Sequence, residues 1–94
     1  MPKIVRRRLI EKGKDDVWRW LFWCPGCEEH HAFEEGRWTK SGTDDAPTFS
    51  PSLVSAPGTP RNCHLFVRAG KIQFLGDCWH GLKGQTVDLP ECDW

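Results

Sequence analysis

The 94-residue chain has no long hydrophobic run and no excess of charge of either sign. No apolar segment approaches the roughly 20 residues that a membrane-spanning helix needs. Residues 1–8, MPKIVRRR, also lack the apolar region of a signal peptide. Thirteen lysines and arginines balance thirteen aspartates and glutamates, so the strongly basic character of nucleic-acid-binding domains is missing. We therefore expect a cytoplasmic protein that uses neither a membrane nor nucleic acid as its default partner.

The sequence also shows no internal repeat, no heptad pattern, no phosphate-binding loop and no clear amphipathic helix. The length permits one domain. A core built from six tryptophans and five phenylalanines is small, so we expect disulfide bonds or a bound metal ion to stabilise it. The sequence predicts one mostly β domain over residues 1–94, an antiparallel sheet of hairpins with little helix.

Five cysteines are many for this length, but their number is odd and no export signal precedes them, so a metal explains them better than disulfides. Cys24 and Cys27 form a CxxC pair around Pro25-Gly26, a tight turn that directs both sulfurs to one point, as in a zinc knuckle. A redox-active CxxC would instead begin a helix. A closed zinc site needs two further ligands.

Residues 63–78 predict a hairpin with Ala69-Gly70 as its two-residue turn. Counting outward from the turn places Cys63 and Cys78 on one face as diagonal neighbours, about 7–8 Å apart. We therefore expect a Zn²⁺ site made by Cys24, Cys27, Cys63 and Cys78, with His64 and His80 as alternative ligands. Cys92 is left out because chain ends fray.

The opposite face of the same hairpin brings His64 and Asp77 together as diagonal neighbours. A histidine beside a carboxylate is the orienting half of a catalytic triad. His64 as a structural histidine or a zinc ligand stays open as an alternative.

Elsewhere the pattern predicts strands at 3–12 and 17–23 joined by a turn at 13–16, and a short strand at 85–89. Residues 40–62 are rich in Pro, Ser and Thr, which predicts irregular chain over the sheet. Three further expectations concern single side chains. Arg6, Arg7 and Arg8 form a solvated edge, His30 and His31 are solvated, and Trp18, Trp20, Trp23 and Trp38 belong to the core.

Five segments together resemble a known family: 22–27 (FWCPGC), 47–52 (PTFSPS), 63–67 (CHLFV), 70–78 (GKIQFLGDC) and His80 with 84–90 (GQTVDLP). This family of unknown function is common in phages and prophages, and its members are often labelled ammonia monooxygenase, an enzyme that a small soluble zinc-type domain matches poorly. Relatives in bacterial ubiquitin-like conjugation operons of the Bub type are regarded as peptidases. The family's Pro-Ser element falls on Pro51-Ser52 and its His-aromatic strand on His64-Leu65-Phe66.

The resemblance implies a small hydrolase of phage or prophage origin that cuts a peptide or isopeptide bond, with a ubiquitin-like protein among its candidate substrates. In this reading Ser52 is the nucleophile, His64 the base and Asp77 its orienting partner. A variant makes zinc the catalyst, held by three of Cys24, Cys27, His64 and His80. The alternative is a non-catalytic zinc module that binds a host or virion protein.

Overall fold

Eight strands and no helix make up the computed structural model, which describes residues 2–9 and 17–92. The strands are β1 Val5–Leu9, β2 Val17–Cys24, β3 Glu29–Glu34, β4 Thr39–Gly42, β5 Pro47–Ser55, β6 Cys63–Arg68, β7 Lys71–Phe74 and β8 Thr86–Asp88. None of these residues forms a helix long and apolar enough to cross a membrane. The mostly β, antiparallel fold is as the sequence predicts, and the turn expected at 13–16 lies outside the described residues.

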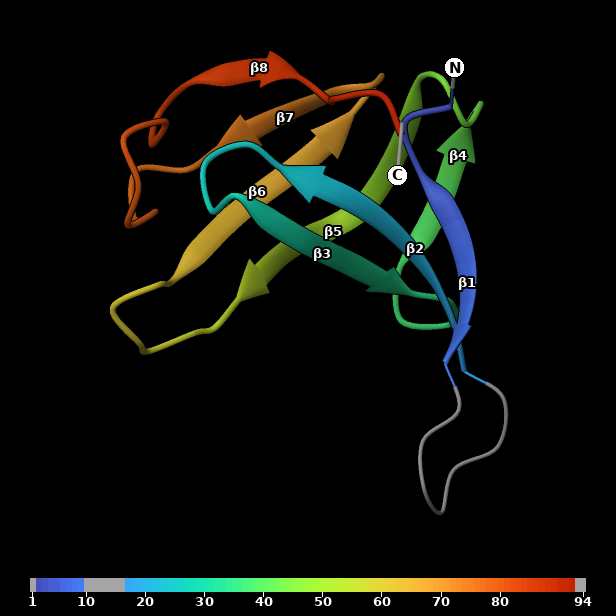
Figure 1. Ribbon diagram of the computed structural model, residues 1–94, viewed down its shortest axis with the longest axis horizontal. Helices are drawn as coiled ribbons and strands as arrows, with labels where there is room; N and C mark the ends of the chain where they lie inside the picture. Colours follow the sequence, from blue (N-terminus) through green and yellow to red (C-terminus); the bar gives the residue numbers. More distant parts are fainter. Residues whose placement is uncertain (1, 10–16, 93–94) are drawn as a thin grey trace.

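The strands form two antiparallel sheets, one in the order β1-β2-β3 and one in the order β4-β5-β6-β7-β8. In Figure 1 the three-stranded sheet crosses in front of the five-stranded one, and β3 passes over β5. The apolar sides of the strands meet between the two sheets, where the Phe33 and Phe49 rings stack with centroids 4.1 Å apart. Each sheet therefore has a buried face and an outer face that carries its polar side chains.

The hairpin of β6 and β7 has the predicted register, with Leu65 opposite Phe74 and Arg68 opposite Lys71. Its turn residues Ala69 and Gly70 both have positive φ, 49° and 77°, as a two-residue hairpin turn requires. The ladder ends at Phe74, because the chain then turns back on itself with the Cys78 N–H donating to the Leu75 carbonyl.

The prediction of irregular chain over residues 40–62 is wrong for 40–42 and 47–55, which belong to β4 and β5, and is confirmed for 43–46 and 56–62. The prolines of β5 are compatible with a strand for two different reasons. Pro47 is the first residue of β5, and Pro51 lies in a bulge where the pairing of β5 with β6 shifts between Phe49 and Leu53. Neither position requires a ladder hydrogen bond from the missing N–H.

The predictions for the β1 arginines and for two of the tryptophans are confirmed, and the prediction for Trp23 is not. β1 is an edge strand with exposed arginines, as predicted, and Trp20 and Trp38 pack against the core. Trp23 is half-buried against exposed His30 instead, because strand alternation turns it away from the buried neighbours Phe22 and Cys24.

His31, expected in solvent, is buried at 7% exposure, and Cys92, expected in a frayed end, is buried at 8%. The Cys92 N–H donates to the Pro2 carbonyl at 2.8 Å, which ties this end of the chain to the other and explains why it does not fray at this position.

Candidate active site and metal centre

A serine, a histidine and an aspartate form a continuous hydrogen-bonded row on the outer face of the five-stranded sheet. His64 Nε2 lies 3.0 Å from Ser52 Oγ, and His64 Nδ1 lies 3.2 Å from Asp77 Oδ2. The His64 side chain is 26% exposed and that of Asp77 is 58% exposed, so the row is open to solvent. Both ring nitrogens are in use, one toward a hydroxyl and one toward a carboxylate, which is the arrangement of a nucleophile, base and orienting acid.

Three different elements supply these side chains. Ser52 lies at the bulge of β5, His64 is the second residue of β6, and Asp77 belongs to the turn that follows β7. Bulges re-aim side chains relative to a regular ladder and are frequent beside active sites. Here Val54, not Ser52, is directly opposite His64 in the register, and the serine reaches the imidazole diagonally.

Two buried or half-buried side chains hold the row from behind. The Trp38 indole Nε1–H donates to the Ser52 carbonyl at 3.2 Å. The Cys78 thiol donates to the His64 carbonyl at 3.0 Å and accepts the His64 N–H at 3.3 Å. The backbones that carry the serine and the histidine are therefore each fixed by a side chain from another element.

A second cluster lies on the buried side of β6. Cys24, Cys27, Cys63 and His80 are all buried, and one ligand atom from each lies within 4.8 Å of all the others. Cys24 and Cys27 flank the turn between β2 and β3, so this site joins the three-stranded sheet to β6 of the five-stranded one.

The structure does not bring Cys78 into this cluster, where the sequence reasoning placed it, and His80 occupies the fourth position instead. The reason is local. The regular β6–β7 ladder ends at Phe74, so counting residue pairs from the hairpin turn does not give the position of Cys78. The turn after β7 directs the Cys78 sulfur to the His64 backbone. His80, named as an alternative ligand, lies with its Nε2 3.5 Å from Cys63 Sγ.

The donor set of this cluster fits a zinc ion. Three thiols and one imidazole are a common structural ligand set, and tetrahedral Zn–S bonds of about 2.3 Å place two sulfurs about 3.8 Å apart, within the observed spacing. Four protein ligands would close such a site and leave no position for water.

The cluster thiols differ in their readiness to ionise. The hydrogen bond from Cys63 lowers the pKa of the Cys24 thiol to about 3, against the opposing effect of burial, and nearby His31 lowers it further. The same hydrogen bond raises the pKa of Cys63, and burial raises the pKa of Cys27. The Cys24 sulfur is therefore the thiol of this cluster that ionises most readily, and the thiolate is the form that binds metal ions.

Partners around the cluster orient its ligands. The Trp79 indole Nε1–H donates to Cys27 Sγ at 3.3 Å, and the Cys27 N–H donates to Cys24 Sγ at 3.4 Å. His31, expected in solvent, is packed near the Cys24 sulfur and belongs with Cys27 and Glu29 to a second, overlapping group of possible ligands.

The family model described as bacterial ubiquitination-like system serine protease (BubE) matches residues 2–75. The chain belongs to this family. The match confirms the relationship to Bub-type peptidases that the sequence motifs implied and assigns the chain at a coarse level to the peptidase-type hydrolases. A search of curated proteins and a search of solved structures each gave no match.

The family match covers Ser52, His64 and the three cysteines of the cluster, and it ends two residues before Asp77. Sequence reasoning missed the supporting roles of Trp38, Trp79 and His31. For Trp79 and His31 the only signal in the sequence is their closeness to a motif residue, as Trp79 is next to His80 and His31 is near the CxxC pair. Trp38 gives no such signal, because Ser52 lies 14 residues further along the chain.

Proposed function

We propose that this protein is a serine peptidase in which Ser52 is the nucleophile, His64 the general base and Asp77 the residue that orients the imidazole. The observation that carries the proposal is the 3.0 Å separation of Ser52 Oγ and His64 Nε2, with the other ring nitrogen held by Asp77. The family of serine proteases to which the chain belongs supports the same reaction class.

The reaction follows from this geometry. Ser52 Oγ adds to the carbonyl carbon of the substrate while its proton passes to His64 Nε2. The C–N bond then breaks, and the same proton goes to the departing amine, which leaves an ester on Ser52. Water, deprotonated by His64, hydrolyses this ester and returns the enzyme to its starting state. Asp77 stabilises the imidazolium that forms in each half of the cycle.

The proposed substrate is a peptide or isopeptide bond in the exposed tail of a protein, with a ubiquitin-like protein as the leading candidate. The family description, which names a ubiquitination-like system, supports a substrate of this kind. The open position of the row agrees with it, since Asp77 and His64 are reachable from solvent.

We further propose that Cys24, Cys27, Cys63 and His80 hold a structural Zn²⁺ ion, which when bound would supply a rigid link between the two sheets. A catalytic zinc would need an open coordination position, and four protein donors leave none. His64 supports this division of roles, because its ring contacts Ser52 and Asp77 rather than the cysteine cluster. The metal would thus act on the reaction through the placement of β6.

A fluorophosphonate probe, which labels activated serines, tests the proposal without knowledge of the substrate. We expect the wild-type protein to be labelled at Ser52, and Ser52→Ala and His64→Ala to lose labelling and peptide cleavage by a factor of about 10³ or more. Ser50→Ala is the matched control, since Ser50 is an exposed serine of the same strand two residues away. Equal labelling of the wild type and Ser52→Ala would overturn the assignment.

A further inference from the structure

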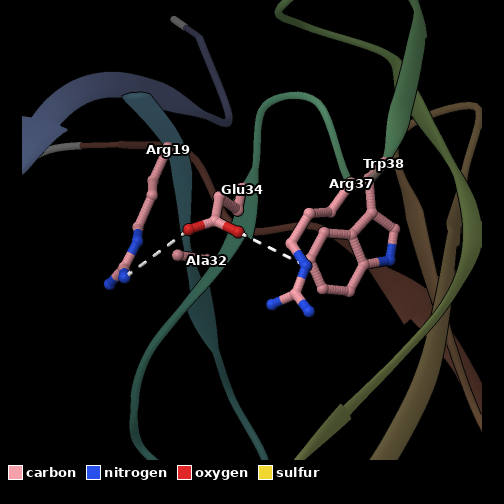
Figure 2. Close-up of a pocket in the computed structure, with 5 residues that line it drawn as sticks. All are labelled: Arg19, Ala32, Glu34, Arg37 and Trp38. Carbon is pink, nitrogen blue, oxygen red and sulfur yellow. Dashed lines mark ion pairs between the residues drawn. The ribbon is translucent and has the colours of Figure 1, made fainter. Parts of the chain in front are cut away.

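A small hollow lies on the opposite side of Trp38 from Ser52. Its volume is about 190 Å³, and it is lined by Arg19, Ala32, Glu34, Arg37 and Trp38. Figure 2 shows these side chains converging from β2, β3 and the turn that follows β3, with the indole of Trp38 forming one wall. Sites for whole small molecules usually measure about 300–1,000 Å³, so this hollow is of a size to take one side chain or one chain end.

Trp38 connects the hollow to the candidate nucleophile. Its indole Nε1–H donates to the Ser52 carbonyl at 3.2 Å, while the ring also lines the hollow. A single indole therefore contacts both the hollow and the Ser52 main chain, and a peptide cleaved at Ser52 would reach the hollow only by extending past Trp38. A ligand that shifts the Trp38 ring from within the hollow would therefore also shift the hydrogen bond from this ring to the Ser52 carbonyl.

The charges of the hollow favour a carboxylate. Glu34 lies between two arginines, with one carboxylate oxygen 4.0 Å from Arg19 Nη2 and the other 3.5 Å from Arg37 Nε. Two guanidinium groups and one carboxylate therefore line the hollow. Arg37 is 74% exposed, and Figure 2 shows its terminal nitrogens pointing away from Glu34. A guanidinium has five N–H donors, so Arg37 retains donors for a second anion.

We propose that this hollow is a substrate subsite that accepts a carboxylate, bound by Arg37 and packed against Trp38. The proposal rests on the peptidase function above and adds to it a preference for substrates that carry an acidic side chain or a free chain end at this position. Glu34 serves as the positioning residue that holds the Arg37 side chain over the opening.

Ala32 gives the subsite its depth. Its small side chain lies on the outer face of β3 and lines both this hollow and a second one of about 250 Å³, which shares Arg19 with the first. The apolar surface of Ala32 and Trp38 next to the arginine would pack against the methylene groups of a substrate side chain. A larger residue at position 32 would fill the hollow without touching the Ser52–His64 hydrogen bond.

Binding can be measured without any cleavage. The indole N–H resonance of Trp38, assigned by its loss in Trp38→Phe, is followed while three peptides are added. Acetyl-Ala-Glu-Ala-amide carries a side-chain carboxylate, acetyl-Ala-Gln-Ala with a free C-terminus carries a chain-end carboxylate, and acetyl-Ala-Gln-Ala-amide carries neither. We expect a saturable shift with at least one carboxylate peptide, and which peptide produces it identifies the source of the group.

The variants decide whether the shift reports the proposed contact. Arg37→Gln should weaken binding by about tenfold or more, as expected for the loss of a charge-assisted hydrogen bond, and Ala32→Leu should abolish it. Lys71→Gln removes one positive charge from β7, away from the hollow, and should bind as the wild type does. No shift with either carboxylate peptide, an equal shift with the neutral peptide, or unchanged binding in Arg37→Gln would overturn the subsite.

Cleavage of a random peptide library, read by mass spectrometry, separates this proposal from the function on which it rests. Enrichment of Asp, Glu or chain ends near the cut, lost in Arg37→Gln, supports both. Cleavage without an acidic preference overturns the subsite and leaves the peptidase standing. No cleavage and no fluorophosphonate labelling, with carboxylate binding still present, overturns the peptidase function and with it the subsite's role in catalysis.

Discussion

The Cys78 thiol contacts the His64 backbone at both of its polar groups, donating to the carbonyl at 3.0 Å and accepting the N–H at 3.3 Å. A cysteine that sequence reasoning assigned to the metal thus lies directly behind the candidate catalytic base. Asp77, the residue before it, reaches the ring of the same histidine. One dipeptide therefore fixes His64 through both its main chain and its side chain.

The first prediction concerns this contact. Cys78→Ala should leave the His64 N–H without its buried partner, which costs about 1–3 kcal/mol of unfolding free energy, and should lower kcat more than it raises KM. Metal content, read by native mass spectrometry, should stay at the wild-type value. Cys78→Ser, which keeps a donor and an acceptor, should recover part of the rate. Loss of the metal in Cys78→Ala would contradict the placement of Cys78 outside the cluster.

The second prediction uses Gly26, in the middle of the CxxC turn. A Cβ atom built at this position would overlap the imidazole ring of His80. Gly26→Ala should therefore push His80 out of the cluster and weaken metal binding, which a competition titration with a chromogenic chelator measures. Gly81→Ala is the matched control, because a Cβ there meets nothing within 4 Å. Equal metal affinity in the two variants would show that His80 is not a ligand.

The third prediction is that metal removal unfolds the protein. Binding to structural zinc sites contributes about 10–16 kcal/mol in small domains, which matches or exceeds the total stability of about 5–15 kcal/mol that folded proteins usually have. A chelator should therefore abolish the native tryptophan fluorescence and the activity together, and added Zn²⁺ should restore both. Activity lost in a protein that stays folded would instead indicate a catalytic metal.

The fourth prediction concerns a surface ion pair that links β1 to the turn after β3. Arg6 donates to both carboxylate oxygens of Glu35, at 2.6 and 2.9 Å, and these hydrogen bonds hold the pKa of Glu35 below its ordinary 4.5. Because the folded-state pKa is the lower one, the pair stabilises the fold above pH 4.5 and loses its effect as pH falls through the folded-state value.

Both side chains of this pair are more than one third exposed, so solvent screening keeps its contribution to stability small. Glu35→Gln should lower the unfolding free energy slightly at pH 7 in denaturant titrations, and the difference from the wild type should shrink steadily below pH 4.5. A stability difference between the wild type and Glu35→Gln that grows on acidification would contradict a lowered pKa of Glu35 in the folded protein.

Much of the β6–β7 hairpin follows from the sequence because a two-residue turn fixes the register of both strands, so counting from Ala69-Gly70 gives the correct partners as far as Leu65 and Phe74. The same counting explains why Cys63 and His64 lie on opposite faces. It fails at Cys78, since no local pattern tells where a ladder stops and a turn begins. The bulge at Pro51 could not be predicted for a related reason. Whether a strand tolerates this proline depends on how β5 pairs with β6, and not on the proline alone.

The position of Cys63 immediately before His64 has a consequence for misfolding. Neighbouring residues on a strand point to opposite faces, and a slip of β6 by one residue exchanges those faces. In a molecule with this shifted register, the His64 imidazole would point into the core and the Cys63 thiol into solvent. The same shift would therefore remove both the candidate metal ligand and the candidate base. Binding of the proposed ion by Cys63 would therefore select the one alignment in which His64 faces outward, so a metal-loaded chain would also have its β6 strand in the correct register.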